Sequence, residues 1–129
     1  TKLLECRVSG ARSLTDARTV AKSIICSSLV KAAMFGADAN WGRVLCAIGY
    51  SGADTDPHGV DVSFSSEAGT VHVCEKGAGV EFSEETAKAV LSADEIRIDV
   101  TLHDGSAEAT AWGCDLTYDY VRINGDYRT

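Results

Sequence analysis

One stretch of the sequence decides the fold class: Ile96-Arg97-Ile98-Asp99-Val100-Thr101-Leu102-His103. Its apolar and polar residues alternate strictly, which is the period of a β-strand with one buried face and one solvated face. The dipeptide Asp104-Gly105 follows and is typical of a tight hairpin turn, and alanines then alternate with other residues through 107–111. The pattern therefore predicts a hairpin of two antiparallel strands.

Similar alternation predicts three earlier strands, at residues 2–8, 60–64 and 71–74, and the stretch Ser65–Gly69 is predicted to connect the last two as a hairpin. Apolar residues at helical spacing, behind a capping side chain or before a glycine, predict the helices. These lie after Ser13, at Ser27–Gly36, from Trp41 to about Tyr50 behind Asn40, after Ser83, and at Tyr118–Asn124. The resulting order, β-α-α-α-β-β-α-β-β-α, predicts an α+β domain of two layers, with a mixed or mostly antiparallel sheet covered by helices.

The composition is that of an ordinary soluble globular chain, with 129 residues, of which 45% are hydrophobic and 24% are charged. This length suits a single domain over residues 1–129, and the longest apolar run, Val44–Tyr50, is too short to span a bilayer. The formal net charge of −7 disfavours nucleic acid and anionic membranes, which attract basic surfaces. We expect neither as a partner.

The cysteines suggest a reducing compartment. They number five, and no Cys-x-x-Cys spacing occurs, so neither a disulfide framework nor a zinc site is indicated. Each stands among apolar or strand-like neighbours, where a free cysteine packs as a small hydrophobe; they are Cys6, Cys26, Cys46, Cys74 and Cys114. We expect a cytoplasmic location, or an organelle matrix if the source is eukaryotic.

Neither a metal nor a cofactor is predicted from the residue pattern. The three histidines, His58, His72 and His103, lie far apart on different elements, so we expect them to face solvent rather than bind a metal. Asp54 and Asp56 share a loop with His58, but the loop offers fewer oxygen ligands than calcium prefers. A plain turn is the expectation there.

Thr1 is a candidate nucleophile by residue type, because an N-terminal threonine can use its own amine as the base. The residues that follow it, Lys2-Leu3-Leu4, begin a strand and supply no loop or helix terminus that could form an oxyanion site. We therefore expect Thr1 to be the first residue of a strand, and no catalytic residue is assigned to this chain.

Two longer motifs resemble a known family. They are LVKAAMFGADANWGR at Leu29–Arg43 and AWGCDLTYDYVRINGDYRT at Ala111–Thr129. Together they resemble the C-terminal part of the β chain of ornithine acetyltransferase, also called glutamate N-acetyltransferase, and the resemblance extends from Lys2 to Thr129. Two positions depart from the family pattern: Ala39, where proline is common, and Gly125, where alanine is usual.

The resemblance implies an acyltransferase of arginine biosynthesis that moves an acetyl group from N-acetylornithine to glutamate through an acetyl-threonine intermediate. In that family a precursor cuts itself before an internal threonine that is followed by methionine and leucine. Thr1 is followed by Lys2-Leu3, so it does not match. The nucleophile and the oxyanion donors would therefore lie upstream, outside this chain, which is expected to be inactive alone.

Substrate binding is the role that the resemblance assigns to this chain, through Asn124 and Thr129. An asparagine offers a donor and an acceptor, and a terminal threonine adds a hydroxyl and a carboxylate, which together suit an amino-acid substrate. The implied partners are the upstream part of the β chain, the α chain of the same precursor, and a second copy in a heterotetramer. No cofactor is implied, although some family members accept acetyl-CoA as an acetyl donor.

Several alternatives stay open. The chain could be a non-catalytic structural and assembly domain, or part of a paralogous acetyltransferase in a secondary-metabolite pathway. The run Asn40-Trp41-Gly42-Arg43 could be a site wall or subunit contact, or a capped helix start with Trp41 as a core anchor. Arg128 could orient Thr129 or pair with Asp126.

Overall fold

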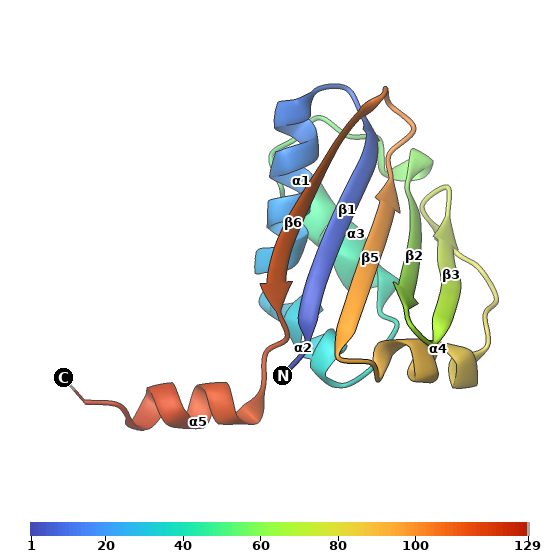
Figure 1. Cartoon of the computed structure of the whole chain (residues 1–129). Coiled ribbons are helices and arrows are strands. Elements are labelled where there is room, and N and C mark those ends of the chain that lie inside the picture. The colour runs from blue at the N-terminus through green and yellow to red at the C-terminus, as the bar shows by residue number, and fades with distance from the viewer. Residues whose placement is uncertain (129) are drawn as a thin grey trace.

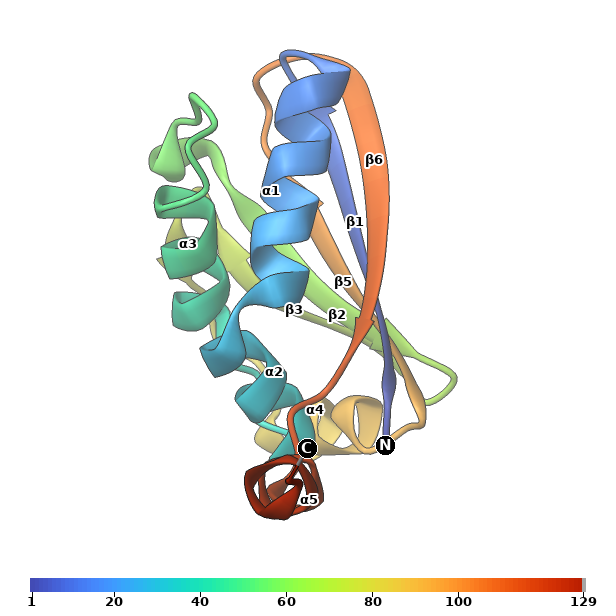
Figure 2. The ribbon, with the colours of Figure 1, turned by 90° about the vertical axis from the view of Figure 1, so that its left-hand side faces the viewer.

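A six-stranded sheet with helices packed against one face forms the body of the chain in this computed structural model, which describes residues 1–128 (Figure 1, Figure 2). The elements are β1 (Leu3–Ala11), α1 (Leu14–Cys26), α2 (Ser28–Phe35), α3 (Trp41–Gly49), the short 3-10 helix η1 (Pro57–Gly59), β2 (Asp61–Ser66), β3 (Gly69–Glu75), β4 (Ala78–Gly79), α4 (Glu84–Leu91), β5 (Glu95–Thr101), β6 (Ala107–Cys114) and α5 (Tyr118–Asp126). The predicted α+β class and element order are confirmed, with η1 and β4 as unpredicted additions.

The strand order is β4-β3-β2-β5-β1-β6. The first strand, β1, pairs in parallel with β5, where Cys6 lies opposite Ile98, and antiparallel with β6, where Cys6 lies opposite Ala111. Strand β2 is antiparallel to both β5 and β3. The sheet is therefore mixed, as predicted.

The predicted hairpin at Asp104-Gly105 is wrong. Strands β5 and β6 do not pair with each other, because β1 lies between them and bonds to both. The connection instead crosses the end of β1, where the Leu102 N–H donates to Ser9 O at 3.0 Å and the Asp104 N–H donates to Gly10 O at 2.8 Å. Such a pairing between the start and the end of the chain leaves no local signal.

The hairpin of β2 and β3 is confirmed, but its turn is shorter than predicted. The ladder continues to the pair Ser66–Gly69, so Ser65 belongs to the strand and only Glu67 and Ala68 form the turn.

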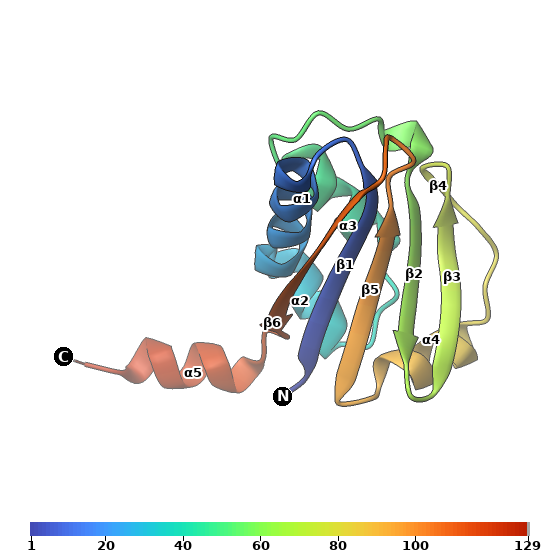
Figure 3. The ribbon, with the colours of Figure 1, turned by 45° about the horizontal axis from the view of Figure 1, so that its top comes forward.

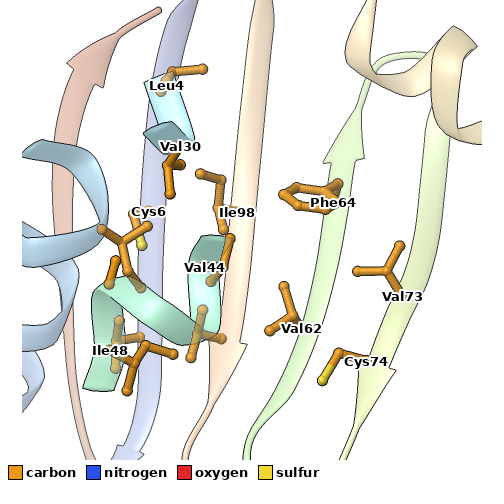
Figure 4. Packing of buried hydrophobic residues seen from close by; sticks show 14 of the residues in the cluster. Leu4, Cys6, Val30, Val44, Ile48, Val62, Phe64, Val73, Cys74 and Ile98 are labelled. Atoms are coloured by element: carbon orange, nitrogen blue, oxygen red, sulfur yellow. The ribbon is translucent and has the colours of Figure 1, made fainter. Parts of the chain in front are cut away.

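The core lies between the sheet and its helices, as Figure 4 shows. Alternate residues of β1 and β5 point into it, including Leu4, Cys6 and Ile98, and all three are fully buried. Phe64 on β2 is the largest fully buried side chain. Burying one such side chain contributes about 1.5–3 kcal/mol, so this apolar layer is the main stabilising term of the fold.

The helices begin at the predicted caps. The side-chain oxygens of Ser13, Asn40 and Ser83 each accept the backbone N–H three residues ahead at 3.1 Å. Ser27 caps α2 in the same way, and Gly36 follows its last residue as predicted. These local bonds satisfy donors that a helix start leaves without an intrahelical partner.

Lys2 connects the start of the sheet to the ends of two helices. Its Nζ donates to Met34 O of α2 at 2.7 Å and to Leu91 O of α4 at 2.8 Å. Carbonyls at helix C-termini lack intrahelical donors and favour a positive charge.

We therefore expect Lys2→Met to lower the free energy of unfolding by about 1 kcal/mol, since the stem is kept while two charged hydrogen bonds are lost from a partly exposed site. Urea denaturation measures the change. Lys22→Met on the exposed side of α1 is the matched control and should shift the midpoint little; equal shifts would contradict the assigned role of Lys2.

The prediction that every cysteine packs as a small hydrophobe is wrong for three of them. Cys6 and Cys74 are buried, and burial raises the pKa of the Cys6 thiol. Cys26, Cys46 and Cys114 are exposed, because each falls on the outer side of its helix or strand.

The three histidines, His58, His72 and His103, are all exposed, as predicted. Asp56 accepts the His58 N–H at 2.9 Å and caps the 3-10 helix η1, so the loop contains a short helical turn that was not predicted. As for membranes, residues 1–128 include no helix with both the length and the apolar character needed to cross one.

Candidate functional site: the C-terminal arm

Helix α5 stands away from the body of the chain as an arm (Figure 3). Thr117 caps it by accepting the Tyr120 N–H at 2.9 Å, and none of its residues is buried. The exposed apolar side chains on and beside it are Tyr118, Tyr120, Val121, Ile123 and Tyr127. A helix of nine residues is marginal in water by itself, and this concentration of exposed apolar side chains favours a contact site.

The joint between the arm and the body lies on α2. The Leu116 N–H donates to Lys31 O at 3.2 Å, and Lys31 Nζ donates to Cys114 O at the end of β6. The ring of Tyr118 packs edge-to-face on Phe35, with centroids 5.3 Å apart. These contacts set where the arm starts, while the rest of α5 extends beyond them.

Asn124 lies on the exposed arm, as its predicted role requires. Its Nδ2 donates to Tyr120 O one turn earlier at 2.9 Å, and its Oδ1 has no partner among residues 1–128. The amide is thus held on the helix with its acceptor oxygen available to a ligand.

The other tail predictions concern Thr129 and Arg128. Thr129, the second predicted substrate-binding residue, lies outside the described residues. Within the described part of the chain, Arg128 forms no ion pair with Asp126, and the ion pair of the arm joins Arg122 to Asp119 at 3.2 Å.

Asp115, at the base of the arm, is a buried carboxylate that sequence reasoning missed. It accepts the Thr1 amine at 2.7 Å, the Thr1 hydroxyl at 2.5 Å and the Lys2 N–H at 2.9 Å. Burial alone would raise the pKa of Asp115, but these hydrogen bonds outweigh it and hold the pKa below its usual value. The sequence shows only an acidic residue next to an alternating strand. The partners of that residue lie at the start of the chain, and Thr1 is 114 positions earlier.

The same contacts describe Thr1. Its amine and its hydroxyl both donate to the Asp115 carboxylate. That Thr1 is not a nucleophile stays a prediction.

The Asn40-Trp41-Gly42-Arg43 run forms a capped helix start. Asn40 caps α3, and Trp41 packs against the core so closely to Gly79 that an added Cβ there would lie 2.5 Å from its ring. Arg43 donates to Leu29 O at 2.9 Å and so ties α3 to α2. These contacts agree with a capped helix start. A site wall or a subunit contact through Arg43 stays a prediction.

A hollow of about 630 Å³ lies away from the arm, on the open face of the sheet. Glu5, Ser65 and Arg97 are among the residues that line it. Neither Thr1 nor Asn124 lines it. Among residues 1–128, no three histidine, cysteine or acidic side chains gather where they could hold a metal ion.

Comparisons with known proteins agree with the motifs. The chain matches the ArgJ family model over residues 1–129. It is 58% identical over 129 residues to arginine biosynthesis bifunctional protein ArgJ 1 of Clostridium acetobutylicum, and 55% identical over 129 residues to the ArgJ protein of Caldanaerobacter subterraneus subsp. tengcongensis. Each match covers 100% of this chain but 32% of the relative, so the chain spans about a third of their length.

A solved structure agrees as well. The crystal structure of arginine biosynthesis bifunctional protein ArgJ from Bacillus halodurans has a TM-score of 0.89 and 47% sequence identity, over 98% of this chain and 58% of that chain. Sequence motifs, family model and fold thus coincide over the full length, and this chain belongs to the ArgJ family.

Proposed function

We propose that this chain is the C-terminal, substrate-binding and assembly portion of an arginine-biosynthesis acetyltransferase, which transfers the acetyl group of N-acetylornithine to glutamate. The observation that carries the proposal is the arm: α5 presents Asn124 on a helix whose side chains are all exposed. The relatives named as arginine biosynthesis proteins are about three times as long, which leaves room for a catalytic part that the arm can reach.

The chemistry assigned to the missing part is acyl transfer through a threonine nucleophile. The threonine oxygen attacks the acetyl carbonyl, ornithine leaves with its amine, and the glutamate amine then takes the acetyl group from the threonine. Such a double displacement needs no metal and no organic cofactor, because the nucleophile divides one hard step into two. Acetyl-CoA is an alternative donor. On this view the chain alone transfers no acetyl group.

The arm contributes orientation. Asn124 has an acceptor oxygen that can receive a hydrogen bond from the ammonium of an amino acid, and Thr129 would add a hydroxyl and a carboxylate. Holding the substrate amine in line with the acyl-enzyme converts a bimolecular encounter into a positioned reaction. We place the enzyme in the cytoplasm, as a complex of the α chain with the β chain and a second copy of both.

The test is Asn124→Ala in the complete enzyme, assayed for acetyl transfer at varied N-acetylornithine and glutamate. We expect KM to rise roughly tenfold, since a hydrogen bond to a charged group is lost. Gly125→Ala is the matched control: an added Cβ meets nothing within 4 Å, so KM should stay unchanged.

Equal kinetics for Asn124→Ala and the parent enzyme would overturn the substrate-binding role. A purely structural and assembly role, which the exposed apolar side chains of α5 favour, predicts a different result. In that case Tyr120→Ala and Ile123→Ala weaken association of the subunits while Asn124→Ala leaves KM unaltered.

A further inference from the structure

Asp115 closes the last pair of the β1–β6 ladder with its side chain. The ladder ends at the pair Leu3–Cys114, so Lys2 and Asp115 would form the next pair. The Asp115 N–H donates to Lys2 O at 3.4 Å, as a strand residue does, but the Lys2 N–H donates to Asp115 Oδ1 at 2.9 Å instead of to the Asp115 carbonyl. A side-chain oxygen thus replaces a backbone acceptor, which frees the backbone after Asp115 to leave the sheet. The chain turns away from β6 at this residue and continues as the arm (Figure 1).

Both oxygens of the Asp115 carboxylate hold residues that precede β1. Oδ1 accepts the Lys2 N–H, Oδ2 accepts the Thr1 hydroxyl, and the side chain of Asp115 is 0% exposed. Rotating this carboxylate would leave a buried charge and buried donors without partners, which costs more than losing an exposed hydrogen bond. Asp115 is therefore a rigid attachment of the arm to the start of the sheet.

The direction of the arm depends on contacts at its base. On the sheet side Asp115 bonds to Lys2, which is itself held by α2 and α4 through Nζ. On the α2 side the Leu116 N–H donates to Lys31 O, and the ring of Tyr118 packs on α2. No residue of α5 is buried. Within residues 1–128, the contacts at the base therefore set the direction in which the helix projects.

A small rotation at the base displaces Asn124 by a distance that matters for binding. Asn124 lies several residues beyond Tyr118, the first residue of α5, and therefore about 9 Å along the helix axis from it. A rotation of the arm by about 15° would move Asn124 by roughly 2–3 Å, whereas a binding group must be held within about 0.5 Å of its productive position. Loosening the attachment at Asp115 is thus enough to take Asn124 out of hydrogen-bond reach of a substrate.

From these observations we propose that Asp115 is a positioning residue of the substrate-binding site, which acts through Asn124 by fixing the direction in which α5 leaves the sheet. The inference rests on the proposed substrate-binding role of Asn124. The competing explanation is that Asp115 only completes the end of the sheet, in which case it contributes to folding stability and not to substrate binding.

A double-mutant cycle in the complete enzyme tests the proposal, with KM for both substrates, kcat and the melting temperature measured for each variant. We expect Asp115→Ala to raise KM about five- to tenfold, because a displaced Asn124 loses its hydrogen bond to the substrate. Asp115→Asn should restore KM to within about twofold of the parent, since the amide keeps an acceptor for the Lys2 N–H and the Thr1 hydroxyl can accept from its NH₂. In the Asn124→Ala background, Asp115→Ala should raise KM no further.

Asp61→Ala is the matched control. Asp61 is a carboxylate that likewise accepts a backbone N–H, from Lys76 at 2.9 Å, and pairs with a side chain, His103 Nε2 at 2.8 Å. It lies opposite Thr101 at the end of β5, whereas the start of β5 lies beside the start of β1, so the two carboxylates are at opposite ends of the sheet. Asp61→Ala should lower the melting temperature, as Asp115→Ala does, and leave KM unchanged.

The outcomes separate this inference from the proposed function. A parental KM for Asp115→Ala, or effects of the two substitutions on KM that multiply in the double variant, would overturn the positioning role and leave the role of Asn124 intact. An Asn124→Ala enzyme with unchanged KM would overturn both. Should Asp115→Ala fail to fold, Thr1→Val takes its place, because it removes only the hydroxyl donor; we expect KM to rise about two- to threefold when Asn124 is present and not otherwise. A parental KM for Thr1→Val would then overturn the proposal.

Discussion

Phe64→Ala is expected to lower the free energy of unfolding by about 3–5 kcal/mol. Phe64 lies on β2 opposite Ile98 of β5 and Val71 of β3, faces the helices, and is fully buried (Figure 4). Removing the ring deletes its buried packing contacts and leaves a cavity. Because β2 is hydrogen-bonded to a strand on each side, the sheet can close that cavity only in part. A domain of this length has roughly 6–19 kcal/mol of total stability, so the loss is a large share of it.

Chemical denaturation monitored by far-UV circular dichroism measures the change. Phe64→Leu is the graded comparison, because it keeps most of the volume and should cost less than about 1.5 kcal/mol. Glu67→Ala, in the exposed turn after β2, should shift the midpoint by no more than about 0.5 kcal/mol. Equal losses of unfolding free energy for Phe64→Ala and Phe64→Leu would contradict both the cavity explanation and the place of Phe64 in the core.

Much of this fold could be predicted because much of it is local. A two-residue alternation determines which residues of β1, β2 and β5 are buried, and a serine or asparagine cap acts within three positions of itself. The predicted starts of α1, α3 and α4 are therefore correct. The partner of each strand is not local. Alternation is equally satisfied by pairing β6 with β5 or with β1, so the position of β1 between them could not be derived from the pattern.

The candidate site divides in the same way. That Asn124 stands on a helix was predictable from the spacing around it, and the family resemblance singled the residue out. The projection of that helix from the body was not predictable, because it depends on contacts that α5 does not make. Asp115 was missed for the opposite reason: its partners Thr1 and Lys2 lie at the other end of the chain. Exposure of Cys26 and Cys46 depended on which flank of each helix meets its neighbour.

Substitutions at Gly105 can distinguish the predicted hairpin from the observed crossover. We expect Gly105→Ala to lower the free energy of unfolding by about 2–3 kcal/mol. In the structure, a Cβ added at Gly105 would lie 2.5 Å from the Ala11 carbonyl oxygen, which is backbone and cannot move aside cheaply. The glycine is thus needed for close approach of two chain segments. In a hairpin turn it would be needed for a positive φ, which asparagine also adopts readily.

The two explanations predict different results for Gly105→Asn. Close approach predicts that asparagine is at least as damaging as alanine, whereas a hairpin turn predicts that asparagine restores most of the loss. Gly52 supplies the matched control, because its φ is +87° and nothing lies within 4 Å of an added Cβ. There, Gly52→Asn should be better tolerated than Gly52→Ala, by a few tenths of a kcal/mol, since the left-handed region favours asparagine. Thermal denaturation of the four variants reads out both comparisons. The same preference for asparagine at positions 105 and 52 would contradict the crossover, and with it the place of β1 between β5 and β6.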